Sequence, residues 1–342
     1  MFETAHPEIA AGGPHPPETL GRIGSAISMS AAAGDTPPKT DRPLLSIGIP
    51  VWNGEQFLRQ TIESLLAQDY GNIELILLDN LSTDGTARIC QEFAEKDPRV
   101  RFLRDTESVT AMEGHKRVAR MARGDLFMGA CDDDVYDTNY VSTLAARVLG
   151  NPEVGLAYGA LAYISTDGEK SFEEPGGPSF RTSAHSRAQN FMQYMLWRRP
   201  LPMGFGVMRT KLHLEALRYF ERVDHDHARW DHDNLWMLRL LTLARVDSCP
   251  DVRFYYRQQD RVAVYTRRQQ LTVDAPSRAR LISNVRHEIK VTRRVFQMLG
   301  EASFDAPTRA LLRMYTLLVL GFNCGGRPLA QKAVALLRGR KA

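Results

Sequence analysis

The first half of the chain alternates between short apolar runs and longer segments that carry apolar residues at helical spacing. Short apolar runs bounded by turn residues are typical of buried strands, and spacings of three and four residues predict helices that bury one face. The predicted strands lie at 44–50, 73–78, 100–103 and 126–130, and the predicted helices at 58–66, 86–96 and 111–122. Strands that alternate with helices predict an α/β fold: a mostly parallel, Rossmann-like central sheet with helices on both faces.

Polar residues follow three of these strands at the point where each one ends. The segments at these three ends, each of which contains polar side chains, are Pro50-Val51-Trp52-Asn53, Asp79-Asn80 and Asp132-Asp133-Asp134. In open parallel sheets, ligands bind outside the carboxyl ends of the strands. Three polar exits at one edge therefore favour a binding site over a chance arrangement.

The run Asp132-Asp133-Asp134 has two interpretations on its own. Ionised carboxylates repel one another, and they lose hydration when they are buried without a partner. A hard divalent cation would relieve that repulsion through oxygen ligands. Alternatively, the run is a solvated acidic turn that caps the next helix. The two other polar exits shift the balance toward a metal site.

The second half of the chain has weaker signals. It predicts strands at 154–163 and 202–209, a polar loop at 165–187, a helix at 191–197 and a late edge strand at 254–257. From about residue 276 the chain is basic and has helical spacing. Such helices pack on the rest of the protein or lie on an anionic membrane surface, and we favour packing.

Composition excludes some classes of function. The formal charge of +4 and the pI near 8.9 permit attraction to phosphate-bearing ligands, but they are too small to indicate nucleic-acid binding. The four cysteines are far apart, which predicts reduced thiols in a cytosolic protein rather than disulfides or a zinc site. No stretch reaches the roughly 18 apolar residues that span a bilayer, and no secretion signal is evident.

Three segments at matching spacing resemble a known family. Residues 46–54 (SIGIPVWNG) resemble the opening strand of the family-2 glycosyltransferases of the GT-A fold, usually V-S-I-x-I-P-x-Y-N. Residues 78–86 (LDNLSTDGT) resemble the family's V-D-D-G-S-T-D-G-T. Residues 123–125 (RGD), followed by a strand and the aspartates, resemble A-x-G-x-x, a strand and D-x-D-D. The resemblance is strong over residues 44–150 and implies a nucleotide-sugar-dependent enzyme.

The chain departs from the family motifs at several positions. Cys131 stands where the first Asp of D-x-D-D is expected, and Asn80 and Leu81 replace Asp-Gly. Residues 107–115 differ from the usual N-x-G-x-x-x-A-x-N, which normally borders the donor. These departures motivate a second hypothesis, a non-catalytic nucleotide-sugar-binding or scaffold protein that keeps the fold. A nucleotidyltransferase on a related sheet is a third.

The resemblance also implies a role for each polar exit. Asp133, backed by Asp134, holds Mg²⁺ or Mn²⁺ on the diphosphate of a UDP-, GDP- or dTDP-sugar. Asp132 lies near the ribose and diphosphate, and Asp79 accepts a hydrogen bond from a base NH. Trp52 offers the base an aromatic face or packs in the core. The donor-binding candidates are Pro50, Trp52, Asn53, Asp79, Asn80 and Asp132.

Inverting transfer needs a base that deprotonates the acceptor hydroxyl. The family takes it from an acidic motif at the start of a helix, which Trp230-Asp231-His232-Asp233 resembles. Asp233 is the first candidate and Asp231 the second, because the register is ambiguous by two residues. Asp at a helix N-terminus is also a common cap, so that alternative stays open.

Together these expectations divide the chain into three parts. Residues 1–43 hold seven of the 18 prolines and no periodicity, which predicts a disordered leader. Residues 44–270 form the GT-A domain, with a nucleotide-sugar-binding half (44–150) and an acceptor half (151–270), and residues 271–342 form a helical extension. We expect an inverting glycosyltransferase at the cytoplasmic face, acting on a glycan or lipid-linked acceptor in cell-surface glycan or glycolipid assembly. A peripheral membrane contact through the C-terminal helices remains the alternative to their packing on the rest of the protein.

Overall fold

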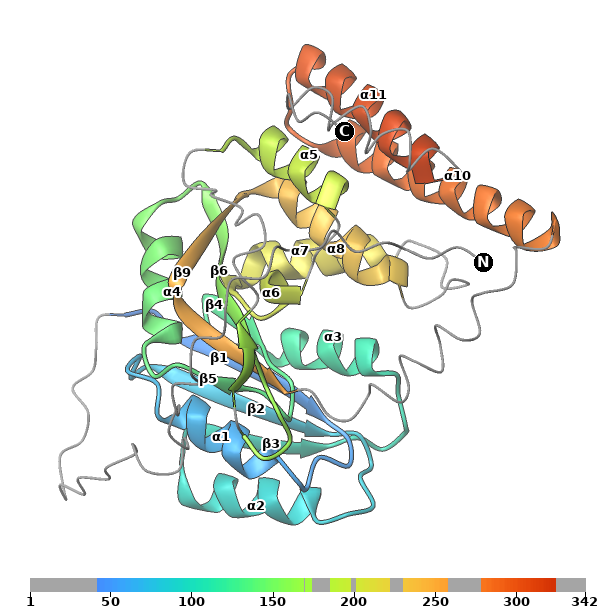
Figure 1. Cartoon of the computed structure of the whole chain (residues 1–342). Coiled ribbons are helices and arrows are strands. Elements are labelled where there is room, and N and C mark those ends of the chain that lie inside the picture. The colour runs from blue at the N-terminus through green and yellow to red at the C-terminus, as the bar shows by residue number, and fades with distance from the viewer. Residues whose placement is uncertain are drawn as a thin grey trace, which may run out of the picture.

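A computed structural model describes residues 42–168, 170–173, 185–197, 201–221, 230–257 and 278–323 (Figure 1). Almost all of the predicted leader lies outside the described residues, as does most of the predicted acceptor loop and the chain after residue 323.

A nine-stranded sheet forms the centre of the described part of the chain. Its strands run in the order β3-β2-β1-β4-β8-β6-β9-β5, and β7 pairs with β6. Neighbours are parallel from β3 through β4 and between β6 and β9, and β8 joins the two groups through antiparallel pairs. The strands are β1 (Leu45–Val51), β2 (Ile73–Asp79), β3 (Val100–Arg104), β4 (Leu126–Gly129), β5 (Val135–Tyr136), β6 (Val154–Ile164), β7 (Lys170–Glu173), β8 (Val207–Arg209) and β9 (Arg245–Arg257).

Helices cover both faces of the sheet, which explains why its central strands are continuous apolar runs. Leu75 and Leu77 of β2 pack in one core cluster, whereas Ile76 and Leu78 face the other. The first cluster lies under α1 (Leu58–Leu66), α2 (Thr86–Lys96) and α4 (Tyr140–Gly150). The second lies under α3 (Ala111–Met121), α5 (Arg187–Trp197), α7 (Thr210–Glu221) and α8 (Trp230–Leu243) (Figure 1). This arrangement confirms the predicted α/β fold class.

The second half differs from the sequence prediction in three elements. The late strand is much longer than expected and is not at an edge, because β9 pairs with β6 on one side and β5 on the other. The exposed Pro250-Asp251 step interrupts its apolar pattern, so only its end was predicted. The strand predicted at 202–209 is a short helix, α6 (Leu201–Gly204), followed by β8. The predicted loop at 165–187 contains β7, which extends the sheet beside β6.

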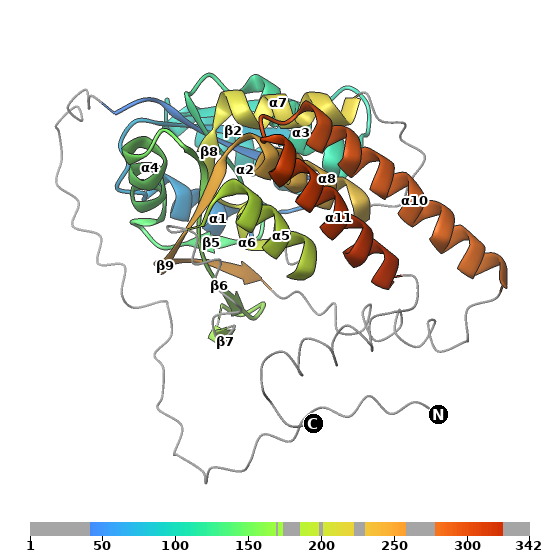
Figure 2. The same cartoon turned by 90° about the horizontal axis from the view of Figure 1, so that it is seen from above.

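Two C-terminal helices, α10 (Arg278–Glu301) and α11 (Ala306–Asn323), lie side by side against α5 and α8 (Figure 2). Val295, Met298 and Leu299 of α10 and Leu312 of α11 are fully buried in the second core cluster. The packing that we favoured for this region is therefore confirmed for its described residues. Among those residues, no helix is long and apolar enough to cross a bilayer.

Candidate functional site

The exit of β1 is tied to the exit of β2 by hydrogen bonds. Asn53 has a φ of 51°, in the left-handed region that Asn tolerates better than most residues. Its backbone N donates to Ser82 Oγ at 2.9 Å, and its Oδ1 accepts from Thr83 N at 2.9 Å. Trp52 is held on this turn with 63% of its surface exposed, so the core-packing interpretation of this side chain is wrong. The turn presents an indole face to solvent.

The two polar residues at the end of β2 are engaged by their own loops. Asp79 is fully buried; its Oδ1 accepts from Ser82 N at 3.0 Å, and its Oδ2 lies 3.2 Å from Arg104 Nε. Asn80 donates to Val109 O and accepts from Val109 N, both at 2.8 Å. Both side chains therefore shape the loops around the strand exits, and their contact with a donor stays a prediction.

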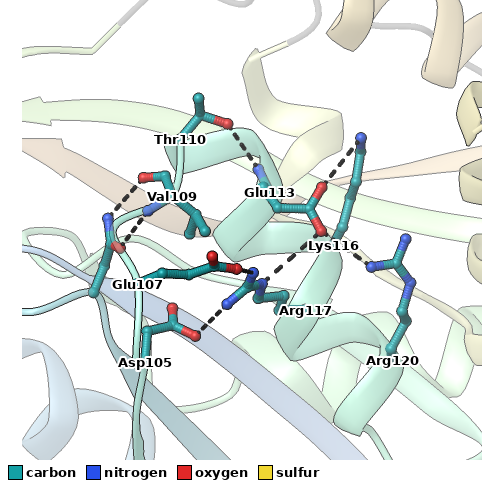
Figure 3. A network of polar contacts seen from close by, with 9 residues as sticks. Asp105, Glu107, Val109, Thr110, Glu113, Lys116, Arg117 and Arg120 are labelled. Carbon is teal, nitrogen blue, oxygen red and sulfur yellow. Dashed lines mark hydrogen bonds and ion pairs between the residues drawn. The ribbon is translucent and has the colours of Figure 1, made fainter. Parts of the chain in front are cut away.

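The segment between β3 and α3 is the one that departs from the family motif, and ion pairs fasten it to α3 (Figure 3). Arg117 of α3 bonds to Asp105 and Glu107. Thr110 caps the helix by accepting from Glu113 N through its side chain. This network fixes the segment without the side chains of the usual motif.

The aspartate run follows β4 and lies against the β1 exit. A Cβ placed on Gly54 would lie 2.6 Å from Asp132 Oδ2, well inside van der Waals contact. The carboxylate can approach the backbone this closely because residue 54 is glycine. Two of the predicted donor-side segments are thus in contact.

Asp134 is the most constrained acid of the run. It is fully buried; its Oδ1 accepts from Arg257 N at 3.1 Å, whereas its Oδ2 has no hydrogen-bond partner. Burial first, and then the charge of Asp133, raises the pKa of Asp134 to about 8. Ligand atoms of Cys131, Asp133 and Asp134 all lie within 4.8 Å of one another. An unpartnered buried oxygen beside two further ligand atoms is a donor set that suits a cation.

Arg257, at the end of β9, holds this loop in place. The side chain is 2% exposed and lies over the Phe57 ring at 4.4 Å. Its Nε donates to Asp133 O at 2.9 Å, and its guanidinium donates to Gln60 Oε1 at 2.6 Å and to Ser165 O at 3.0 Å. Desolvation lowers its pKa. These contacts make Arg257 a buried side chain that holds the aspartate loop against β9 and α1. Nothing near it in sequence indicates that role.

The two candidate bases lie at the start of α8. The helix begins at Trp230, so Asp231 and Asp233 fall in its first turn, as the family motif implies. Their side chains lie outside the described part of the structure, and their roles stay predictions.

Comparison with known proteins agrees with this geometry. Residues 46–210 match the model of the family described as glycosyl transferase family 2. This stretch runs from the start of β1 to the start of α7 and includes all three polar exits.

Among curated relatives, the chain is 33% identical over 105 residues to the glycosyltransferase GlyG of Streptococcus pneumoniae, covering 31% of this chain and 35% of GlyG. It is 34% identical over 135 residues to the O-antigen biosynthesis protein RfbC of Myxococcus xanthus, covering 38% of this chain and 10% of RfbC. The match thus spans about a third of the length of the first of these relatives and a tenth of the second.

Among solved structures, residues 1–349 of S. aureus TarS in complex with UDP-GlcNAc superpose with a TM-score of 0.56 at 14% identity. The superposition covers 82% of this chain and 72% of that one. At this identity the likeness establishes the fold, which is of the predicted GT-A type. Residues 46–210 therefore form a domain that matches glycosyl transferase family 2.

Proposed function

We propose that this protein is an inverting glycosyltransferase that moves a sugar from a nucleotide-diphosphate sugar to an acceptor hydroxyl. The observation that carries the proposal is the contact between the aspartate run and the β1 exit at the carboxyl edge of the parallel strands. This is the edge at which open α/β sheets bind ligands. The match of residues 46–210 to glycosyl transferase family 2 supports the same reaction.

For the donor, we propose a nucleotide sugar of the UDP, GDP or dTDP class. The base would stack on the exposed ring of Trp52. An aromatic face can stack with any base, because stacking requires no base-specific hydrogen bonds. Pro50, Asn53, Asp79 and Asn80 would shape the surrounding wall, and Asp132 would face the ribose and diphosphate. The solved structure of TarS with UDP-GlcNAc supports a uridine nucleotide as the first donor to test.

The donor set after β4 supports a divalent cation, Mg²⁺ or Mn²⁺, held by Asp133 and Asp134. The orphaned Oδ2 of Asp134 fits such a cation because an ion would satisfy its lone pairs. When bound, the cation neutralises charge that develops on the departing diphosphate. GalNAc-T7, solved with UDP, GalNAc and Mn²⁺, superposes with a TM-score of 0.50 at 12% identity, covering 64% of this chain and 45% of that one.

We propose Asp233 as the base that takes the proton from the acceptor hydroxyl, with Asp231 as the second candidate. The support is their position in the first turn of α8. Asp233→Asn should bind donor as the wild type does and lose transfer. Full turnover in that variant, together with loss of turnover in Asp231→Asn, would assign the role to Asp231.

As the acceptor class we propose a glycan or lipid-linked glycan of the cell surface, which the name of RfbC supports. A cytoplasmic location fits Cys90, Cys131 and Cys249, which form no disulfide bonds. A peripheral membrane contact is supported by α11, whose exposed Leu311, Met314, Leu317 and Leu318 lie on one side of the helix. Residues 278–342 contain thirteen Lys and Arg against three Asp and Glu, so an anionic lipid surface complements the charge of this part of the sequence.

A non-catalytic nucleotide-sugar-binding protein is the second candidate, motivated by Cys131 and Asn80 at motif positions. Thermal unfolding with a panel of nucleotide sugars, with Mn²⁺ and with a chelator, identifies the donor, because a ligand that binds only the folded state raises the melting temperature. A transferase should release nucleoside diphosphate from the donor that stabilises it. Stabilisation without any release, in the presence of metal and a range of glycan acceptors, would favour the scaffold.

A further inference from the structure

Cys131 begins the loop that carries the aspartates, at the position where an acid was expected. Its Sγ lies within 4.8 Å of carboxylate oxygens of both Asp133 and Asp134. We propose that Cys131 is a direct ligand, so that the cation site is a mixed thiolate–carboxylate site that prefers thiophilic divalent cations such as Co²⁺ and Zn²⁺ over Mg²⁺. The inference deepens the proposed function and rests on it for the place of the cation.

A second, independent observation at this place points to a cation. Asp134 has no exposed surface, and its Oδ2 is a buried acceptor without a hydrogen-bond partner. A buried acceptor of this kind costs free energy unless another group satisfies it. Arg257 is a buried base whose backbone N donates to Asp134 Oδ1, but its side-chain hydrogen bonds go to Gln60 and to backbone carbonyl oxygens. A carboxylate oxygen of Asp134 lies within 4.8 Å of ligand atoms of Cys131 and Asp133, so an ion among these three side chains would lie beside the unsatisfied carboxylate.

The ligand types determine which ion fits. Carboxylate oxygens alone suit Mg²⁺ and Mn²⁺, whereas a thiolate selects softer metals and adds affinity for the later first-row ions. When the thiol binds, it loses its proton to solvent and the thiolate takes the coordination position. Cys131 is only partly buried, so a metal ion can reach Sγ and the thiol proton can leave to solvent.

The other described thiols differ and provide the control. Cys90 and Cys249 are buried, and desolvation raises their pKa to about 12 and about 11, respectively. Neither belongs to a group of three metal-ligand side chains in the described part of the chain. Cys249→Ala therefore removes a thiol without touching the site.

The experiment titrates Co²⁺ into the full-length protein and follows absorbance. The wild type and Cys249→Ala should show a sulfur-to-cobalt charge-transfer band in the near ultraviolet, and Cys131→Ser should lack it. Removing a direct ligand should also weaken Co²⁺ binding by at least about tenfold, while Mg²⁺ binding changes much less. Circular dichroism verifies that each variant is folded.

A second variant, Cys131→Asp, converts the site to carboxylates only. It should bind Mg²⁺ at least as tightly as the wild type and still lack the sulfur-to-cobalt charge-transfer band. The proposal is overturned if Cys131→Ser binds Co²⁺ with unchanged affinity, or if bound Co²⁺ gives no band in the wild type. Either result leaves a carboxylate site and the proposed function intact. Failure of the wild type to bind any divalent cation, even with a nucleotide sugar, would overturn both.

Discussion

At the scale of single residues, Asp134 sets ligand binding against stability. Its carboxylate is fully buried and crowded by Asp133, and one of its oxygens has no partner. Arg257 N can still donate to the amide oxygen of an asparagine at this position. Burying a neutral amide costs less free energy than burying a crowded carboxylate.

We therefore expect Asp134→Asn to raise the free energy of unfolding of the metal-free protein by about 1 kcal/mol or more. The same variant should no longer be stabilised by Mn²⁺. Urea unfolding with and without Mn²⁺ measures both effects. Asp125→Asn, which replaces an exposed carboxylate at the start of β4, is the matched control and should change neither. A less stable Asp134→Asn that still responds fully to Mn²⁺ would contradict the assignment.

His213 makes a separate residue-scale prediction about pH. It is buried, stacks on Phe127 at 4.8 Å and contacts Trp236 edge-on. Burial first, and then the charge of His115, lowers its pKa to about 3. Between that value and the ordinary pKa near 6.5, the unfolded chain binds a proton that the folded protein does not.

Stability should therefore fall as the pH drops below about 6.5, by up to roughly 1.4 kcal/mol per pH unit from this residue. His213→Phe keeps an aromatic ring and should flatten that decline. Unfolding free energies at pH 7.5, 6 and 5 give the two slopes. Equal slopes in the variant and the wild type would show that His213 does not titrate in this way.

Sequence motifs located residues at the strand exits but not their partners. The run Asp132-Asp133-Asp134 follows a buried strand directly, so its position was predictable. That Asp79 would be buried against Arg104, and Asn80 bonded to Val109, was not. Such partners come from loops whose conformation depends on the assembled sheet. The spacing of residues along the chain does not predict that conformation.

At the scale of elements, one strand brings a distant residue into the site. β9 runs beside β6 and β5, and this places Arg257 at the aspartate loop. The planar guanidinium makes several directed hydrogen bonds there, which an ammonium group cannot reproduce.

Arg257→Lys should keep the charge, lower the free energy of unfolding by about 2 kcal/mol and weaken divalent-cation binding, because the loop loses its clamp. Arg245→Lys, at the other end of β9, should stay within about 1 kcal/mol of wild type, since its partner Glu153 is exposed. Denaturant unfolding and calorimetric metal titration measure the two effects. Unchanged cation affinity in Arg257→Lys would remove the clamp from the account.

Elements with regular apolar patterns were predictable, and interrupted ones were not. The strands β1 to β4 and the helices between them match the sequence prediction within a residue or two. The full length of β9 was not predicted, because its apolar alternation breaks at Pro250-Asp251. Only its end was predicted, as a short edge strand. The long-range pairing with β6 sustains the strand through that break.

At the scale of the whole molecule, charge and apolar exposure gather at the C-terminus. Residues 278–342 carry a formal charge of +10, whereas the entire chain carries +4. The exposed face of α11 lies in this region, with Leu317 and Leu318 55% and 53% exposed. A helix of this kind binds anionic bilayers through the apolar area that it buries and through its attraction to negatively charged lipid headgroups.

We expect the protein to float with vesicles that contain anionic lipid and to bind neutral vesicles much less. The double change Leu317→Glu and Leu318→Glu should reduce binding more than tenfold, since each buried leucine contributes about 1.5–3 kcal/mol. Leu149→Glu, at an exposed leucine on α4, is the control. Unaltered flotation of the double variant would show that this face does not bind the membrane. A wild-type dimer that the double variant abolishes would show that the face binds a second copy of the chain.

The central claim is metal-dependent sugar transfer at the loop after β4. The most direct test measures nucleoside diphosphate release from the stabilising nucleotide sugar, by the wild type and by Asp133→Ala, each with Mn²⁺ and with a chelator. The account predicts turnover by the wild type with Mn²⁺ only, and a loss of at least about a hundredfold in Asp133→Ala, on the scale of a lost catalytic electrostatic contact. Turnover in Asp133→Ala at the wild-type rate, unaffected by the chelator, would contradict it.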